Sequence, residues 1–316
     1  MLKTRIQELD YLKSIFIILM VMFHLVYFGD KYPYAKELVY TFHMSAFLIL
    51  SGYLVNINKD FKSFFRMLLW IFIPYVIMES GYVVMASILP IREHIDGLNI
   101  KIVLEKIFKE PLGPYWYFHT IIICDVFYYV IYRLDIGKTE LSNLIVLGLS
   151  LFLVSCSPLN LLSFENAMYF LIGVWVKRRS KTFLSFFQPS LLSIIPLIVL
   201  CCYSQNLNRA LLSGVVITYL VVSLLLALYR YIPSSVKNVT NYIGRNTLVI
   251  LLFSPIFTIL SKLFIPVFAF DPTGICFMCV AVAFSIAGCF LVSYIMDRIH
   301  LSIFFFGKKQ ILEWIL

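Results

Sequence analysis

The chain has 316 residues, of which 61% are hydrophobic and only 14% charged, and its formal net charge is +9. A soluble globular domain has roughly 45–50% apolar and about 25% charged residues, so this composition excludes an ordinary soluble protein and indicates an integral membrane protein. The apolar runs continue nearly from end to end and leave no soluble block large enough to build its own core. We therefore expect a single integral-membrane domain over residues 1–316.

A transmembrane helix needs about 17–25 apolar residues. Apolar segments of about this length are therefore predicted to be transmembrane helices. They cover residues 11–28, 40–57, 67–89, 115–134, 141–157, 164–177, 190–205, 209–229, 246–268 and 274–297. The fifth, sixth and seventh are short, which predicts tilted, partly re-entrant or locally thin-bilayer positions. The predicted fold class is an all-α, polytopic membrane protein with about ten transmembrane helices.

The basic residues set the expected orientation of these helices. With the N-terminus inside, most of the 26 Lys and Arg residues fall in inner segments, as the positive-inside rule requires. Both termini are therefore predicted to be cytoplasmic in a multi-pass protein of a cell (inner) membrane. The basic residues sit in short runs beside apolar segments and form no stripe on a soluble face, which indicates topology signals and contacts with membrane lipid, not nucleic acid.

Residues 90–114 form the one sizeable loop, which this orientation places outside. Its apolar residues recur at helical spacing and predict an amphipathic helix on the outer surface. These residues are Ile100, Val103, Leu104, Ile107 and Phe108. We favour a structural cover; the alternative is a lid over an outward-facing site.

Two histidines inside predicted spans are the strongest functional candidates, because an ionisable residue in hydrocarbon is costly. His24 lies on the order of 16 Å above Lys13 along the first helix, and His43 lies just under the outer surface on the second. Consecutive antiparallel helices pack as neighbours, so the two imidazoles are expected to share one pocket. An imidazole can take a proton from a hydroxyl near neutral pH; the alternative is a hydrogen-bonded interhelical histidine.

Glu79 reaches a similar depth, roughly 20 Å above Arg66 on the third helix. It is a candidate carboxylate partner that orients an imidazole. The alternative is that it satisfies a buried polar group.

At the inner face, Lys13, Lys62 and Arg66 bracket the ends of the first three helices. Positive-inside anchoring explains most such residues, and the functional alternative is a cradle for a phosphorylated cytoplasmic donor. The sequence has no Walker loop and no G-x-G-x-x-G. Cys276 and Cys279 form a C-x-x-C without a histidine or second pair, so no metal is expected there.

In order and spacing, these residues resemble the acyltransferase family 3 of multi-pass O-acyltransferases. The resemblance covers nearly the whole chain and is most specific in the first third. Its segments are Leu9-Asp10-Tyr11-Leu12-Lys13 with His24 after ten intervening residues, Phe42-His43-Met44-Ser45-Ala46-Phe47, Ser51-Gly52-Tyr53, Arg66-Met67-Leu68-Leu69 leading to Pro74-Tyr75, Tyr115-Trp116-Tyr117-Phe118, Phe170-Leu171-Ile172-Gly173 and Gly244-Arg245-Asn246-Thr247-Leu248.

The resemblance implies a ten-helix domain that delivers an acyl group, usually acetyl, from a cytoplasmic acyl-CoA to a hydroxyl of an extracytoplasmic glycan. It implies that His24 is catalytic and that Lys13 contacts the donor. Arg66 is similar to one arginine of the family's R-x-x-R motif, but Ser63 occupies the place of the other, and Lys62 is a candidate substitute. Ser254 also departs from the histidine of many relatives.

We therefore predict an O-acetyltransferase that uses acetyl-CoA as acyl donor and a surface polysaccharide or lipid-linked glycan as acceptor. His24 is the predicted general base, assisted by His43 or Glu79. The CoA phosphates are predicted to contact Lys13, Arg66 and Lys62. The main alternative is a non-enzymatic transporter or flippase of a lipid-linked saccharide, in which the same polar residues line a substrate path; a third is a glycan polymerase or glycosyltransferase.

Overall fold

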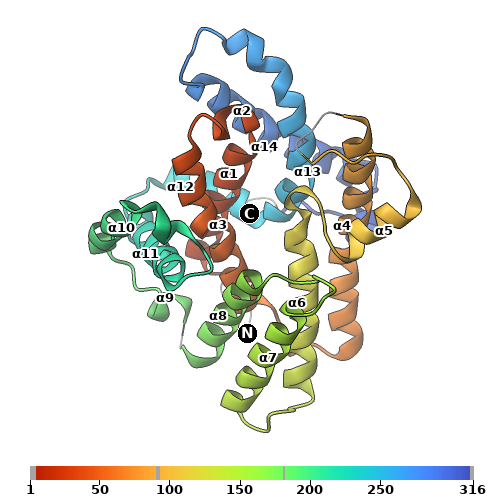
Figure 1. Cartoon of the computed structure of the whole chain (residues 1–316), viewed down its shortest axis with the longest axis vertical. Coiled ribbons are helices and arrows are strands. Elements are labelled where there is room, and N and C mark those ends of the chain that lie inside the picture. The colour runs from red at the N-terminus through yellow and green to blue at the C-terminus, as the bar shows by residue number, and fades with distance from the viewer. Residues whose placement is uncertain (1–4, 90–92, 181, 314–316) are drawn as a thin grey trace. The chain divides into compact units, whose positions relative to one another are not determined.

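The computed structural model describes residues 5–89, 93–180 and 182–313, and these residues are all-α (Figure 1). They form two compact units whose placement relative to one another is not determined. Of the described residues, the first unit comprises 5–47, 182–300 and 310–313, and the second comprises 48–89, 93–180 and 301–309. The predicted all-α class is confirmed for the described residues.

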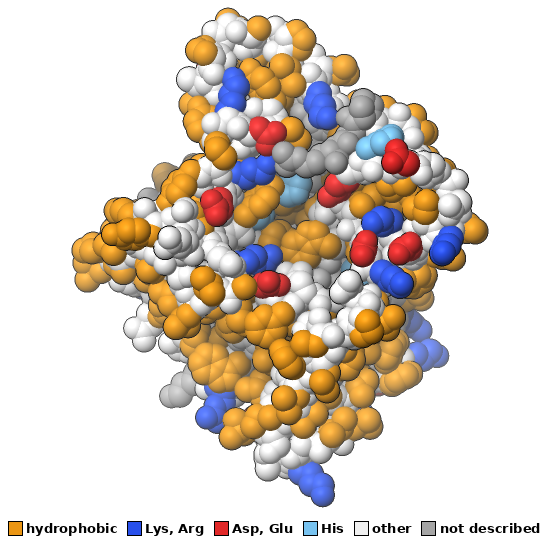
Figure 2. All heavy atoms as spheres, viewed as in Figure 1, with side chains coloured by type: hydrophobic (Ala, Val, Ile, Leu, Met, Phe, Trp, Pro, Cys, Tyr) orange, Lys and Arg blue, Asp and Glu red, His pale blue; other side chains and the backbone are white. Residues whose placement is uncertain are grey.

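Several helices in the described part of the chain are long and apolar enough to cross a membrane. They are α4 (Phe61–Ile88), α11 (Leu212–Tyr229), the run Thr247–Phe268, and α14 (Ile275–Arg298). Many large apolar side chains are exposed, among them Leu192 and Leu212 at 74% and 78%, and hydrophobic side chains cover much of the face in Figure 2. Such surfaces are expected where helices face lipid, and they indicate a multi-pass membrane protein. The number of ten crossings stays a prediction.

The first unit is arranged around α1 (Gln7–His24). Glu8 and Asp10 lie in its first turn, where carboxylates favour a helix N-terminus, and the extended backbone of Leu25 ends it. Its other helices are α2 (Val26–Gly29), most of α3 (Pro33–Leu54), α9 (Phe183–Phe186), η2 (Leu191–Ser193), α10 (Ile194–Cys201), η3 (Ser204–Leu207), α11, α12 (Ser234–Arg245), α13 (Thr247–Leu260), η4 (Ser261–Phe268) and α14. Within this unit α1 packs against α11, α12, α13 and α14.

The contact between α1 and α12 is unusually close. A Cβ added at Gly244 would overlap the backbone carbonyl oxygen of Asp10, so the backbones meet without an intervening side chain. This approach brings the end of α12 to the first turn of α1.

The second unit packs α4, α6 (Trp116–Arg133), α7 (Glu140–Ser155) and α8 (Phe164–Arg179) together with the end of α3. Its remaining helices are α5 (Ile100–Phe108), η1 (Gly113–Tyr115) and α15 (Ser302–Phe306). Helices α4, α7 and α8 each begin at a polar N-cap whose side chain accepts a backbone N–H of the first turn. These caps are Asp60, Thr139 and Ser163.

Two glycine-containing motifs of the sequence meet in this unit. A Cβ at Gly52 would overlap the carbonyl oxygen of Phe170, and a Cβ at Gly173 would overlap that of Ile49. The end of α3 and α8 therefore cross backbone to backbone, the geometry that small residues permit between membrane helices. This crossing gives the Ser51-Gly52-Tyr53 and Phe170-Leu171-Ile172-Gly173 segments a structural role.

The observed helices differ from the predicted spans at several places, of which the span 190–205 and the helix α12 are two. The predicted span 190–205 is a short 3-10 turn followed by α10, which ends at Cys201. In addition α12, which the apolar runs do not predict, is polar along one side and buries Asn241, Ile243 and Gly244. A search for long apolar runs misses a helix of this kind, because only one of its faces is covered.

Candidate functional site

His24 and His43 lie close to one another at the outer end predicted for α1 and α3. His24 is the last residue of α1, and its ring centroid is 6.1 Å from that of Tyr40. The ring of Tyr40 is in turn 5.2 Å from that of His43. His24 is partly exposed, whereas His43 is only 2% exposed. The structure thus brings the two predicted imidazoles to the same tyrosine.

The hydrogen bonds of both histidines fix which ring nitrogen is available. Nδ1 of His24 bonds to the carbonyl oxygen of Met20 at 2.7 Å, and Nδ1 of His43 bonds to that of Val39 at 2.7 Å. A carbonyl oxygen can only accept, so Nδ1 carries the hydrogen in each ring. In the neutral imidazole Nε2 is then the base. Among the described residues, Nε2 of His43 has no hydrogen-bond partner.

Polar residues from three further positions surround this pair. Thr41 donates to the carbonyl of Leu207 at 2.6 Å, which ties α3 to η3 and the segment after it. Arg209 in that segment interacts electrostatically with His43. Lys36, whose ammonium lies 5.9 Å from the Tyr40 ring centroid, does the same with His24. Cationic side chains therefore lie within electrostatic range of both imidazoles.

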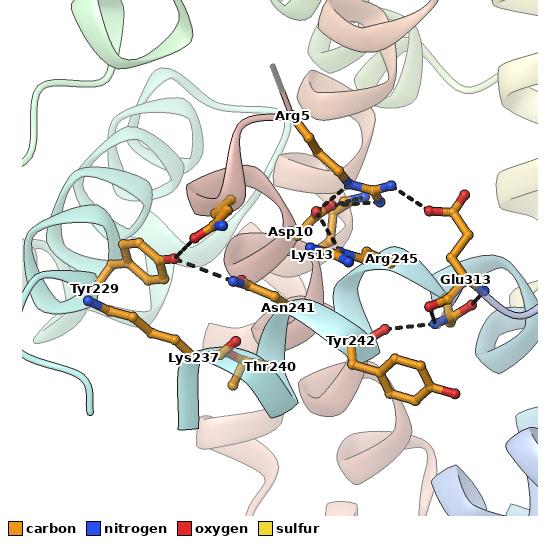
Figure 3. Close-up of polar contacts among 12 residues, drawn as sticks. Arg5, Asp10, Lys13, Tyr229, Lys237, Thr240, Asn241, Tyr242, Arg245 and Glu313 are labelled. Atoms are coloured by element: carbon orange, nitrogen blue, oxygen red, sulfur yellow. Dashed lines mark hydrogen bonds and ion pairs between the residues drawn. The ribbon is translucent and has the colours of Figure 1, made fainter. Parts of the chain in front are cut away.

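A cluster of charged residues lies at the opposite end of α1, built around the buried carboxylate of Asp10 (Figure 3). Arg5 Nε donates to Asp10 Oδ2 at 2.6 Å, and Lys13 Nζ lies 2.7 Å from Oδ1. Arg245, the last residue of α12, has its Nε 3.8 Å from Oδ2. Arg5 also pairs with Glu313 near the C-terminus. Lys13, the predicted donor-binding residue, is therefore one of three cations around one acid.

The charge on Asp10 is stabilised by its neighbours. Burial by itself raises the pKa of this carboxyl group, but the Arg5 guanidinium and the Lys13 ammonium outweigh burial and hold the pKa of Asp10 below its usual range. Asp10 precedes the first predicted span and remains ionised at neutral pH. It therefore presents a fixed negative charge to all three cations.

Lys62 and Arg66 lie in the second unit, at the start of α4. Both are exposed, and their spacing of four residues places them on the same side of the helix. Ser63, which stands in place of the second arginine of the R-x-x-R motif, donates its backbone N–H to the N-cap Asp60 at 3.1 Å. The two predicted donor-binding cations are thus available together on one helical face.

Glu79 also lies in the second unit, where it holds the outer segment against α4. Its Oε1 accepts the backbone N–H of Leu112 at 2.8 Å, and Tyr75 one turn earlier donates to the carbonyl of Ile107 at 2.5 Å. Among the described residues its Oε2 has no hydrogen-bond partner. One carboxylate oxygen thus has a structural role, and the predicted pairing with an imidazole of the first unit stays a prediction.

The sequence did not indicate functional roles for Tyr40, Asp10 or Arg245. Asp10 and Arg245 belong to segments that resemble the family. About 235 residues separate them in the sequence, and their contact depends on the packing of α1 against α12. The sequence signal that could have indicated Arg245 is its position at the end of a polar stretch between two apolar segments.

These features define a class: a multi-pass, all-α membrane protein with imidazoles suited to proton transfer near one end of α1 and a cation cluster at the other. The sequence matches the acyltransferase domain of acyltransferase family 3 over residues 6–294, and the chain belongs to this family. A search of curated proteins gave no match, and a search of solved structures gave none. The resemblance predicted from the sequence is confirmed, and membership implies acyltransferase activity with an acyl donor and an acceptor.

Proposed function

We propose that this acyltransferase moves an acetyl group from cytoplasmic acetyl-CoA to a hydroxyl of an extracytoplasmic glycan or lipid-linked sugar. The proposal depends on the hydrogen bond of His24. Its Nδ1 is bonded to the Met20 carbonyl, which leaves Nε2 as the basic nitrogen. The partial exposure of His24 gives an acceptor access to this nitrogen. The protein is proposed to act as a single domain with ten crossings in the cell (inner) membrane.

In this reaction His24 removes the proton of the acceptor hydroxyl. The hydroxyl oxygen attacks the thioester carbonyl, the carbon–sulfur bond breaks, and the CoA thiolate leaves and takes up a proton. General base catalysis of this kind contributes typically about 10²–10⁴-fold. His43 and Glu79 are the proposed assistants, His43 because its buried Nε2 is unpaired and Glu79 because it is a carboxylate at the predicted depth.

Lys13, Arg66 and Lys62 are the proposed contacts of the CoA phosphates on the cytoplasmic side. Cationic side chains bind phosphate oxygens through charge-assisted hydrogen bonds. Ten helical residues lie between Lys13 and His24, which places the two residues about 16 Å apart along α1. The thioester must therefore reach deep into the protein, either on the extended arm of CoA or through a relay of acyl carriers.

Acetyl transfer in liposomes tests the proposal. Purified protein with acetyl-CoA and glycan acceptors should show turnover, and His24→Gln should lower it by about 100-fold or more. The matched control is His94→Gln, which removes an exposed imidazole of the outer segment and should keep full activity. Retained turnover in His24→Gln would contradict the assignment.

The acceptor is identified by a second measurement, the mass-spectrometric comparison of surface glycans from cells with and without the gene. Loss of acetyl groups from one glycan supports the proposal. Movement of a lipid-linked saccharide across vesicles without acyl-CoA would instead support a transporter.

A further inference from the structure

The cluster around Asp10 holds more positive charge than its own carboxylate can neutralise. Arg5, Lys13 and Arg245 converge on Asp10, whose side chain is only 4% exposed. The next carboxylate, Glu313, is on the C-terminal segment and pairs with Nη1 of Arg5. Without Glu313 the three cations exceed the one acid by two charges, which is the charge of a phosphate monoester.

Arg245 is the member of this cluster whose bonding is incomplete. Its Nε lies 3.8 Å from the carboxylate, beyond hydrogen-bond length, and has no hydrogen-bond partner among the described residues. Its side chain is 20% exposed and that of Lys13 is 17% exposed. Both cations therefore keep N–H donors that can bind an anion. These donors lie near solvent and are partly shielded from it.

The backbone holds Arg245 in this place. Gly244 sits directly against the carbonyl of Asp10, and Asn246 accepts the backbone N–H of Glu313 at 2.9 Å. The residues on either side of Arg245 are thus fixed to α1 and to the C-terminal segment. Because the backbone around it is fixed, the Arg245 side chain starts from a defined position, and less conformational entropy is lost when it binds a ligand.

We propose that Arg245 and Arg5 join Lys13 in binding a phosphate group of the CoA donor, and that Asp10 is the positioning residue that aligns these three cations. This inference rests on the proposed function, because it takes CoA to be the donor. The Glu313 carboxylate on Arg5 shows that the cluster already accepts an anion. The phosphate comes from the 3′-phosphate or from the pyrophosphate of CoA.

Equilibrium binding of CoA to the purified protein in detergent tests this site without acyl transfer. Arg245→Gln should weaken CoA binding by about 10- to 100-fold, the loss expected for a charge-assisted contact, and Arg245→Lys should restore part of it. The matched control is Arg230→Gln, which removes an exposed cation just before α12 and should bind CoA normally. Unchanged binding in a folded Arg245→Gln variant would overturn the proposal.

Dephospho-CoA separates the two phosphate sources. If the cluster binds the 3′-phosphate, Arg245→Gln has little effect on dephospho-CoA; if it binds the pyrophosphate, both ligands weaken equally, and either result supports the site. For Asp10→Asn, the KM for acetyl-CoA should rise at least several-fold while kcat changes little. A fall in kcat at unchanged KM would overturn the positioning role.

His24→Gln distinguishes this inference from the proposed function. It should lower transfer by about 100-fold or more and leave CoA binding, with its dependence on Arg245, intact. If the wild-type protein transfers no acetyl group but binds CoA in an Arg245-dependent way, the proposed function is contradicted and the phosphate site is retained. Normal acetyl transfer with an unchanged KM for acetyl-CoA in Arg245→Gln would contradict the phosphate site and keep the proposed function.

Discussion

At the residue scale, the same local bond serves two histidines in different surroundings. Each imidazole donates from Nδ1 to the carbonyl four residues earlier on its own helix, so each ring is oriented without help from another helix. His24 is reachable, and His43 is enclosed beside it. The burial of an unpaired Nε2 costs about 1–3 kcal/mol in typical proteins, which favours a functional reason for His43.

His43→Leu tests that reason. Removing the unpaired nitrogen should leave thermal stability unchanged or slightly higher, because an unsatisfied buried group is lost, whereas acetyl transfer should fall by about 10-fold or more. Thermal unfolding in detergent and the liposome assay measure the two effects. A large loss of stability with normal specific activity would instead show a purely structural histidine.

The structural role of Glu79 and its proposed chemical role can be measured separately. In Glu79→Gln the amide oxygen can still accept from Leu112, so hydrogen exchange at Leu112 should stay slow, while acetyl transfer should fall by about 10-fold or more because an amide cannot take up or release a proton as a carboxyl group does. Glu79→Ala should speed exchange at the Leu112 amide and lower transfer as well. Full activity in Glu79→Gln would leave Glu79 with only the role of holding the outer segment.

At the element scale, the crossing between the end of α3 and α8 depends on two glycines that face carbonyl oxygens of the opposite helix. Packing of this kind cannot absorb even one methyl group unless the backbones separate. Gly81, in the middle of α4, is a different case, because a Cβ there would meet nothing within 4 Å. The same substitution should therefore have opposite effects at the two positions.

Gly173→Ala should destabilise the protein by about 1–3 kcal/mol, the usual range for overpacking. Gly81→Ala should be neutral or stabilising by up to about 1 kcal/mol, because alanine is the better helix former. Thermal or denaturant unfolding of the two variants in one detergent gives the comparison. Equal stability of the two proteins would show that the crossing is loose.

At the scale of the whole molecule, sequence periodicity predicted most helices and the two imidazoles, since apolar runs and intramembrane histidines are local signals. It did not predict α12, whose residues are polar on one side, nor the contact of Asp10 with Arg245. That contact depends on Gly244, which lets the backbones of α1 and α12 touch. Lys13 was found from its motif, but its partners required the fold. Glu79 was assigned from its depth alone, which could not reveal its bond to Leu112.

The cluster at Asp10 also bears on topology. Arg5 pairs with Glu313, and Asn246 holds the same C-terminal residue, so the two ends of the described chain meet within one unit. Chain ends that meet outside the hydrocarbon lie on one side of the membrane, which requires an even number of crossings between them. The predicted excess of inner Lys and Arg residues favours the cytoplasm as that side, and the predicted ten crossings would satisfy the even number.

Alkaline phosphatase fusions test this arrangement, because that enzyme is active only after export. A fusion after Glu105, in the outer segment, should be active, whereas fusions after Arg179 and at the C-terminus should be inactive. The short helices α7 and α10 are the weak points of the count, and an error in one of them would reverse every later segment. With the N-terminus inside, an active C-terminal fusion would therefore demand an odd number of crossings, and the Arg5–Glu313 pair could not form.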